Sequence, residues 1–301
     1  MMRKAICLLV FFSAMLATTF AQKKMGILEY AYNTTVKISA IDSTIKKDGK
    51  EIVYGEDATG LFFVFETTRG SVPAIVTSAH VLRAATTITF FFREGQGLTN
   101  VPAYNKQQKI TLKKSDLVIF LHPDPSVDLA VIPINPILNV FASKKINISY
   151  NALNEATIPK DSAMNEITPM ETVYVVSHPA GLQNELSSLP LASKGSTATP
   201  FFLDHNGKKE FLAEVPVYAG STGAPVIIYQ ANNLTRHDEP MMGHRILLGG
   251  IVSATYTKGF GERVMVPGRY PSGVSGNYEN VLVVIRSQRL LDFKRLLNEL
   301  K

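Results

Sequence analysis

The sequence predicts an all-β protein built as two six-stranded barrels and closed by a C-terminal amphipathic helix. From residue 36 onward, short β-branched or aromatic runs recur about every 8–14 residues, which is typical of barrels and sandwiches and not of βαβ units. A polar, proline-containing stretch over residues 135–160 divides these runs into two sets. From residue 287 onward the apolar residues follow a helical period instead.

The runs give the expected strands and domain boundaries. The first set comprises residues 36–41, 61–66, 74–78, 86–92, 109–112, 117–122 and 129–134. The second set comprises residues 171–177, 201–203, 210–217, 224–229, 246–256 and 280–285. We therefore expect one barrel over residues 22–145, a second barrel over 146–286, and a helix over 287–301 that docks its leucine-rich stripe on the second barrel.

The first 21 residues are expected to be a secretory signal and not part of the fold. Arg3 and Lys4 form a basic start, an apolar stretch follows over residues 5–16, and small residues precede a cleavage point between Ala21 and Gln22. The apolar stretch is too short for an ordinary membrane span, and none follows it, so we expect no span after cleavage. The alternative is an uncleaved N-terminal anchor.

The cysteine content and the net charge limit which cellular compartments and which partners are expected. The single cysteine, Cys7, lies in the signal, so the mature chain would lack disulfides, thiolate nucleophiles and cysteine zinc sites. This composition favours a bacterial secreted or periplasmic protein. The net charge of +6 is mild, and the lysine pairs are scattered without interleaved aromatic residues, so no nucleic-acid partner is expected.

A tight glycine-rich turn over residues 220–223 is the strongest local signal of chemistry. It reads Gly-Ser-Thr-Gly, follows an apolar run and continues as Ala-Pro-Val-Ile-Ile. Glycines at such a turn allow backbone N–H groups to converge on a developing anion. The stretch resembles the nucleophile loop of trypsin-like, chymotrypsin-fold serine peptidases, Gly-x-Ser-Gly-x-Pro-Val, but Thr222 stands where that family has serine.

The resemblance extends over roughly residues 36–285, with its landmarks in the family's order. Thr-Ser-Ala-His-Val, ending in His80 and Val81, is similar to the family's histidine motif. Asp128 precedes an apolar strand and follows His80 by 48 residues. The order histidine, aspartate, nucleophile is the one that the chymotrypsin type uses. The strand at residues 58–63, the segment 174–182 and Leu-Gly-Gly-Ile-Val-Ser, ending in Ser253, are also similar to family segments.

The resemblance implies a role for each matched residue. His80 would be the general base, Asp128 would orient it, and the hydroxyl of Ser253 would support Asp128. The backbone N–H groups of Gly220 and Thr222 would form the oxyanion hole.

The extra methyl group on Thr222 leaves three interpretations open. The chain is a non-catalytic relative, or a slow or specialised hydrolase that uses Thr222, or an enzyme in which Ser221 supplies the hydroxyl.

Two functional hypotheses follow from these residues. The first is an exported trypsin-like endopeptidase that hydrolyses peptide bonds by acyl transfer through a His-Asp-Thr triad. The second is an inactive pseudoprotease that binds a peptide or protein partner in the cleft between the barrels. No cofactor is expected, the remaining histidines show no metal-ligand spacing, and we expect a monomer.

Overall fold

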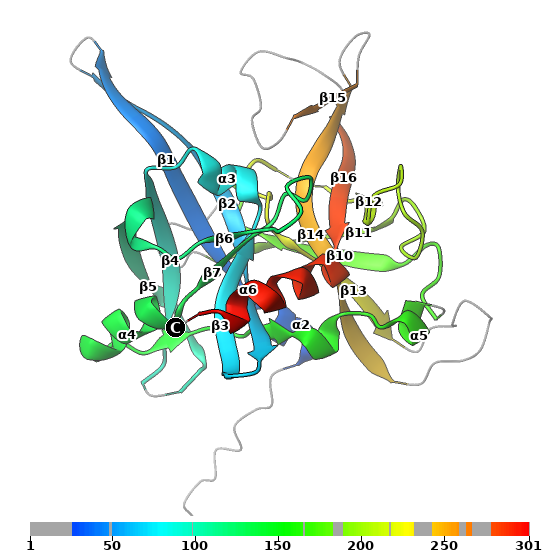
Figure 1. The fold of residues 1–301 in the computed structure, drawn as a ribbon, viewed down its shortest axis with the longest axis horizontal. Coiled ribbons are helices and arrows are strands. Elements are labelled where there is room, and N and C mark those ends of the chain that lie inside the picture. The colour runs from blue at the N-terminus through cyan, green and yellow to red at the C-terminus, as the bar shows by residue number, and fades with distance from the viewer. Residues whose placement is uncertain are drawn as a thin grey trace, which may run out of the picture.

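The computed structural model describes residues 26–47, 50–97, 99–164, 166–182, 189–216, 218–231, 243–258, 263–266 and 278–300. The expected signal, its cleavage point between Ala21 and Gln22, and Cys7 lie outside these residues. Within them the chain is mostly β, arranged as two sheets that lie side by side (Figure 1). The two-barrel, chymotrypsin-like architecture expected from the sequence is confirmed.

The N-terminal half forms a nine-stranded antiparallel sheet with one short parallel pairing. Its principal strand order is β5-β4-β1-β2-β3-β7-β6, while β8 pairs with β4 and β9 pairs with β2. The strands are β1 (Thr35–Lys47), β2 (Lys50–Thr67), β3 (Gly70–Thr77), β4 (Thr87–Gly95), β5 (Pro102–Lys113), β6 (Phe120–Leu121), β7 (Ala130–Pro133), β8 (Ile148–Ser149) and β9 (Leu153–Asn154). This sheet contains nine strands, and the two beyond the seven runs expected for this half are the short β8 and β9, which follow β7.

The C-terminal half closes into a barrel of six strands. The order β13-β10-β11-β12-β16-β14 returns to its start because β14 also pairs with β13, and β15 extends β14. The strands are β10 (Thr172–Ser177), β11 (Leu191–Thr197), β12 (Glu210–Glu214), β13 (Pro225–Ala231), β14 (His244–Lys258), β15 (Arg263–Val266) and β16 (Tyr278–Arg286). Closure pairs both edges of the six-stranded sheet, which leaves no open edge within it.

The helices are short and lie outside the sheets. They are α2 (Ile27–Tyr32), α3 (Ala79–Arg83), α4 (Asn135–Ser143), α5 (Asp161–Met164) and α6 (Lys294–Asn298), with 3₁₀ turns at Lys114–Asp116, Glu155–Thr157 and Ser287–Phe293. The expected C-terminal helix is thus present, but its first half is a 3₁₀ helix. The stretch 135–160, expected to be an irregular crossing, instead contains α4, two short strands and a 3₁₀ turn.

Two local strand assignments were wrong. Residues 201–203 form a turn and not a strand, and β11, which the sequence did not predict, takes the place in the barrel. Phe201 is nevertheless fully buried against Phe211, so its apolar character reflects core packing from a loop. The stretch 117–122 pairs only at β6, and residues 117–119, which follow the 3₁₀ turn, form a bend and irregular chain.

Three apolar clusters explain how the two halves are held together. One fills the first sheet around Ile38, Phe90 and Phe92, and another fills the second barrel around Phe211 and Val226. The third lies between the halves and combines residues of both sheets, including Phe63, Val131, Ile227 and Leu248.

The C-terminal segment covers the cluster between the halves. Leu290, Phe293 and Leu297 are fully or almost fully buried in it, and Figure 1 shows α6 lying across the junction of the two sheets. The segment was expected to dock on the second barrel, but it packs against both sheets.

Candidate active site

His80 lies at the point where a buried strand of the first sheet runs into a single turn of helix. β3 ends at Thr77 and α3 begins at Ala79, so the histidine sits in the first turn of α3. Ser78 between them has an extended backbone, and its hydroxyl donates to the carbonyl of Val252 in the second sheet at 3.1 Å. The turn that carries His80 is thereby tied to the opposite half of the molecule.

The structure brings His80, Asp128 and Ser253 together. Asp128 lies in the loop between β6 and β7, and its Oδ1 accepts the backbone N–H of His80 at 2.8 Å. Its Oδ2 lies 2.5 Å from Nδ1 of His80 and accepts the hydroxyl of Ser253 at 3.3 Å. A carboxylate on Nδ1 fixes the orientation of the imidazole and leaves Nε2 as the atom that exchanges protons.

Carboxylates on both edges of the ring control the charge of His80. Burial lowers the pKa of His80, but the bond to Asp128 and the nearby carboxylate of Glu56 outweigh it and raise the pKa from 6.5 to about 9. For Asp128, burial raises the pKa, but the hydrogen bonds from His80 outweigh burial and hold the pKa below its ordinary value. The pair is therefore an imidazolium next to a carboxylate at neutral pH.

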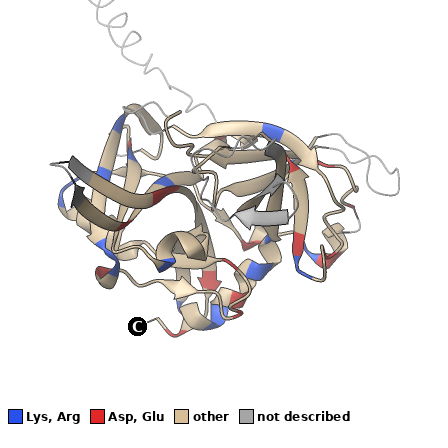
Figure 2. Cartoon of the chain, turned by 90° about the horizontal axis from the view of Figure 1, so that it is seen from above, with Lys and Arg blue, Asp and Glu red and all other residues tan. Residues whose placement is uncertain are grey.

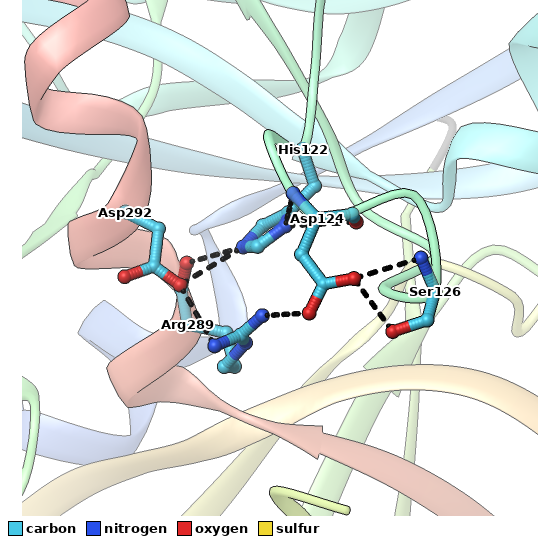
Figure 3. Close-up of polar contacts among 5 residues, drawn as sticks. All are labelled: His122, Asp124, Ser126, Arg289 and Asp292. Atoms are coloured by element: carbon cyan, nitrogen blue, oxygen red, sulfur yellow. Dashed lines mark hydrogen bonds and ion pairs between the residues drawn. The ribbon is translucent and has the colours of Figure 1, made fainter.

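The loop that carries Asp128 is clamped by the C-terminal segment (Figure 3). The backbone N–H of Asp124 donates to Nδ1 of His122 at 3.0 Å, which leaves Nε2 to donate to Asp292 at 3.1 Å. Arg289 lies between the two acids, 2.8 Å from Asp124 and 3.1 Å from Asp292. Hydrogen bonds from Ser126 to Asp124 are the main cause that lowers the pKa of this carboxyl. These contacts fix the chain four residues before Asp128.

Thr59 on β2 ties the loop around Thr222 to the first sheet. Its backbone N–H donates to the carbonyl of Thr222 at 2.9 Å, and its hydroxyl donates to the carbonyl of Gly220 at 2.8 Å. The same hydroxyl accepts the N–H of His178 at 2.8 Å. One threonine on β2 thus connects the first sheet to the glycine-rich turn and to the residue that follows β10.

The two glycines of the turn are required by its backbone. Gly220 has φ +94°, and a Cβ there would lie 2.6 Å from the carbonyl oxygen of His178. Gly223 has φ +80°, and a Cβ there would lie 2.2 Å from the carbonyl oxygen of Thr59. Side chains are disfavoured at such φ values and would clash at such distances. The Gly-x-Thr-Gly pattern therefore reflects a turn pressed closely against both halves of the molecule.

Within the turn, the expected oxyanion donors are available and the two hydroxyls have different surroundings. Among the described residues, the N–H groups of Gly220 and Thr222 donate to no protein acceptor. The hydroxyl of Ser221 donates to Ser177 at 3.1 Å and accepts the N–H of Tyr218, so it is engaged within the second barrel. Thr222 is buried and makes no side-chain hydrogen bond to His80, both residues being described.

Thr222 and Ser221 also line a small pocket in the second barrel. The other residues of its lining are Tyr218, Ala219, Val252, Ala254 and Thr255. The lining contains no charged side chain.

Comparison with known families identifies the fold at this point. The model of the trypsin-like peptidase domain matches residues 58–234, a span that runs from the strand of Thr59 through His80, Asp128 and the glycine-rich turn. The chain belongs to the trypsin-like peptidase family.

The sequence identity between this trypsin-like peptidase and individual known proteins is low. No curated protein sequence matches it. One similar solved structure is the inactive form of Rv3671c from M. tuberculosis, a serine-to-alanine mutant, with 11% identity, a TM-score of 0.43, and coverage of 92% of this chain and 94% of the other. Another is the HtrA-type protease AlgW with tripeptide, with 12% identity, a TM-score of 0.46 and coverage of 90% of this chain. The chain spans 62% of that AlgW structure.

One residue of this trypsin-like site was missed by sequence reasoning. Glu56 on β2 faces the other edge of His80, with its Oε1 3.7 Å from Nε2. In the sequence it is the first of two adjacent acids, Glu56 and Asp57, three residues before Thr59, and no motif marks it. Only the antiparallel pairing of β2 with β1 and β3, together with the position of α3, brings it to the histidine.

Two other kinds of feature, a metal-binding cluster and a membrane-spanning helix, were sought in the described part of the chain. There, no three His, Cys, Asp or Glu side chains come close enough to hold a metal ion, and no helix is long and apolar enough to cross a membrane. Figure 2 shows Lys and Arg interspersed with Asp and Glu over the strands and loops of both halves. The site is therefore one of histidine, carboxylate, hydroxyl and backbone amide groups.

Proposed function

We propose that the chain is an exported serine-type endopeptidase with a variant triad of His80, Asp128 and Thr222. The observation that carries this proposal is the bidentate grip of Asp128 on His80, one oxygen on the backbone N–H at 2.8 Å and the other on Nδ1 at 2.5 Å. Such a grip matters for a histidine that must receive and return a proton in a fixed direction. A core histidine that serves only packing gains nothing from it.

The reaction would use acyl transfer. His80 in its neutral form takes the proton of the Thr222 hydroxyl as the oxygen attacks the peptide carbonyl, and the N–H groups of Gly220 and Thr222 stabilise the oxyanion. The imidazolium then gives its proton to the leaving amine, which breaks the peptide bond and leaves an ester on Thr222. Water activated by His80 hydrolyses the ester and restores the hydroxyl.

The glycine-rich turn supports Thr222 over Ser221 as the nucleophile. The carbonyl of Thr222 accepts the N–H of Thr59 at 2.9 Å, which holds Thr222 against the first sheet, the half that also carries His80. The hydroxyl of Ser221 is bonded to Ser177 instead. A nucleophile taken from Ser221 would have to break that bond and change the register of the turn.

The second candidate function is a pseudoprotease that binds a peptide or protein partner without turnover. Two observations favour it. Thr222 carries a methyl group that restricts its χ1 rotation, and the proton-accepting edge of His80 faces the carboxylate of Glu56. Both would slow the attack step while leaving the site able to bind.

A fluorophosphonate probe separates these two functions, because it labels only an activated hydroxyl. The mature chain is treated at pH 9 alongside Thr222→Ser, Thr222→Ala and His80→Ala. The peptidase proposal expects labelling of the wild type that Thr222→Ala and His80→Ala abolish and that Thr222→Ser increases. Labelling restricted to Thr222→Ser would favour the pseudoprotease, and labelling that persists in Thr222→Ala would point to Ser221.

Export and assembly state are part of the same proposal. We propose cleavage between Ala21 and Gln22, on the basic start and short apolar stretch that precede it. Mass spectrometry of the protein recovered from the periplasm or medium of an expressing bacterium checks this, since a chain that still begins at Met1 contradicts it. Light scattering of the mature chain tests the expected monomer.

A further inference from the structure

His80 lies between two carboxylates, only one of which is explained by the proposed triad. Asp128 takes Nδ1, while Oε1 of Glu56 lies 3.7 Å from Nε2, within ion-pair distance but beyond a hydrogen bond. Both Nε2 of His80 and Oε1 of Glu56 are buried without a hydrogen-bond partner among the described residues. The side chains are only 19% and 15% exposed. Oε1 of Glu56 is thus held in the site without a hydrogen-bond donor.

The role of Nε2 in acyl transfer indicates which part of a bound peptide lies near Glu56. In acyl transfer this nitrogen must come within hydrogen-bond distance of the leaving amine, because it gives that amine its proton. A carboxylate oxygen 3.7 Å from the same nitrogen therefore borders the residue that follows the scissile bond. A carboxylate there is within reach of the side chain of that residue.

Apart from the imidazolium of His80 at 3.7 Å, no cation within the described chain is paired with Glu56. Lys37, on the neighbouring strand β1, is paired with Asp57 at 2.9 Å. Arg83, at the end of α3, is exposed and lowers the pKa of Asp128, so its charge acts on the other carboxylate. A buried carboxylate without a donor is costly, and a charge-assisted bond from an ammonium or guanidinium group would relieve that cost.

We propose that Glu56 is a specificity-determining residue that binds a Lys or Arg side chain on the residue directly after the scissile bond. The inference rests on the proposed peptidase function and adds the class of substrate: peptides with a basic residue at that position. An acidic side chain there would meet a like charge in a half-enclosed site and be rejected.

Binding of such a side chain also increases the fraction of His80 that is neutral, and so able to act as general base, at neutral pH. Three charged groups face or border the ring: Asp128 on Nδ1, Glu56 on Nε2, and Arg83 beside Asp128. When the substrate's cation pairs with Glu56, one of the two carboxylates that hold the proton on the imidazole is neutralised. A basic residue should therefore raise kcat as well as lower KM, whereas a side chain that only anchors the peptide would change KM alone.

Cleavage-site profiling on a proteome-derived peptide library tests the preference. The wild type and Thr222→Ser are each compared with and without Glu56→Gln, and the products are read by mass spectrometry. We expect Lys and Arg after the scissile bond to be enriched about tenfold over neutral residues, the enrichment to be lost with Glu56→Gln, and an acidic preference to appear with Glu56→Lys. Glu66→Gln, the same charge change at the exposed far end of β2, should leave the preference unchanged.

A binding measurement keeps the inference testable without turnover. The dipeptide amides Arg-Ala-NH₂ and norleucine-Ala-NH₂ are titrated into Thr222→Ala while the imidazole resonances of His80 are followed by NMR. We expect the arginine dipeptide to bind about tenfold more tightly, and Glu56→Gln to remove the difference. The absence of any cleavage would contradict the peptidase proposal, but this binding difference would still support the cation site. Cleavage without a basic preference, or equal binding of the two dipeptides, would overturn the role of Glu56.

Discussion

Replacing Asp128 with asparagine should release the proton that His80 holds at neutral pH. In the wild type, burial favours the neutral ring, but Asp128 at 2.5 Å and Glu56 at 3.7 Å together outweigh it and raise the pKa of His80 to about 9. Asparagine has nearly the same shape and can still accept the backbone N–H of His80, but it carries no charge. The substitution therefore removes the stronger of the two favourable interactions with the imidazolium while keeping the loop geometry.

The size of the effect follows from these pKa values. With a pKa of about 9, only about 1% of His80 is neutral at pH 7, whereas at 6.5 about three quarters would be neutral. We expect Asp128→Asn to lower the pKa of His80 by at least about one unit, a tenfold change in proton affinity. Combining it with Glu56→Gln should bring the pKa below 6.5, because burial is then the main influence left.

A histidine-selective NMR titration from pH 5 to pH 10.5 measures these values directly. The His80 resonance is assigned by its absence in His80→Gln, and Glu66→Gln serves as the charge control. A wild-type pKa near 6.5, or a pKa that does not move when both carboxylates are neutralised, would refute the charge assignment. Either result would also remove the physical reason for expecting His80 to be protonated, and therefore unable to accept a proton, at neutral pH.

The pKa shifts of His80 and Asp128 also predict how the stability of the fold depends on pH. The pKa of His80 is raised on folding, so its contribution is fully present below pH 6.5 and is lost as the pH rises through about 9. The pKa of Asp128 is lowered on folding, so its contribution is present above its ordinary value and is lost as the pH falls through the lowered one. Urea unfolding should therefore show a loss of stability from pH 6.5 to 9 that His80→Gln removes.

Three further substitutions test other parts of the site. Gly223→Ala places a Cβ 2.2 Å from the carbonyl of Thr59 at φ +80°, so we expect a loss of more than about 2 kcal/mol in the free energy of unfolding, measured in urea. Thr59→Val removes one hydroxyl that serves two backbone groups and should cost about 2–4 kcal/mol, with Thr59→Ser as the matched control; equal stability of the two would contradict the bonding. Phe293→Ala empties a fully buried site in the cluster between the sheets, and its cost of about 4 kcal/mol should appear as a lower thermal midpoint.

The sequence predicted those parts of the site that depend on short, locally constrained motifs. The glycines at 220 and 223 were recognisable because their positive φ and close contacts tolerate no side chain. His80, Asp128 and Ser253 were recognisable because each matches a family segment and the segments follow in the family's order, and the structure brings the three together. The two-barrel fold followed from strand spacing, and the match to trypsin-like peptidases agrees with it.

What could not be predicted depends on contacts between distant segments. Glu56 reaches His80 only through the pairing of β2 with its neighbours, and nothing in its local sequence separates it from an ordinary surface acid. The clamp on the Asp128 loop joins His122 to Asp292, 170 residues apart in the chain. The strand at 191–197 was missed because its residues are polar and partly exposed, so its pairing with β10 and not its burial makes it a strand.

The C-terminal clamp couples the geometry of the site to the packing between the two halves of the molecule. Arg289 and Asp292 hold the loop before Asp128, while Phe293 and Leu297 of the same short segment fill the junction of the two sheets. Because one segment does both, a change that loosens the junction would also release the loop that positions Asp128. The orientation of His80 therefore depends on the contact between the halves as well as on the first sheet.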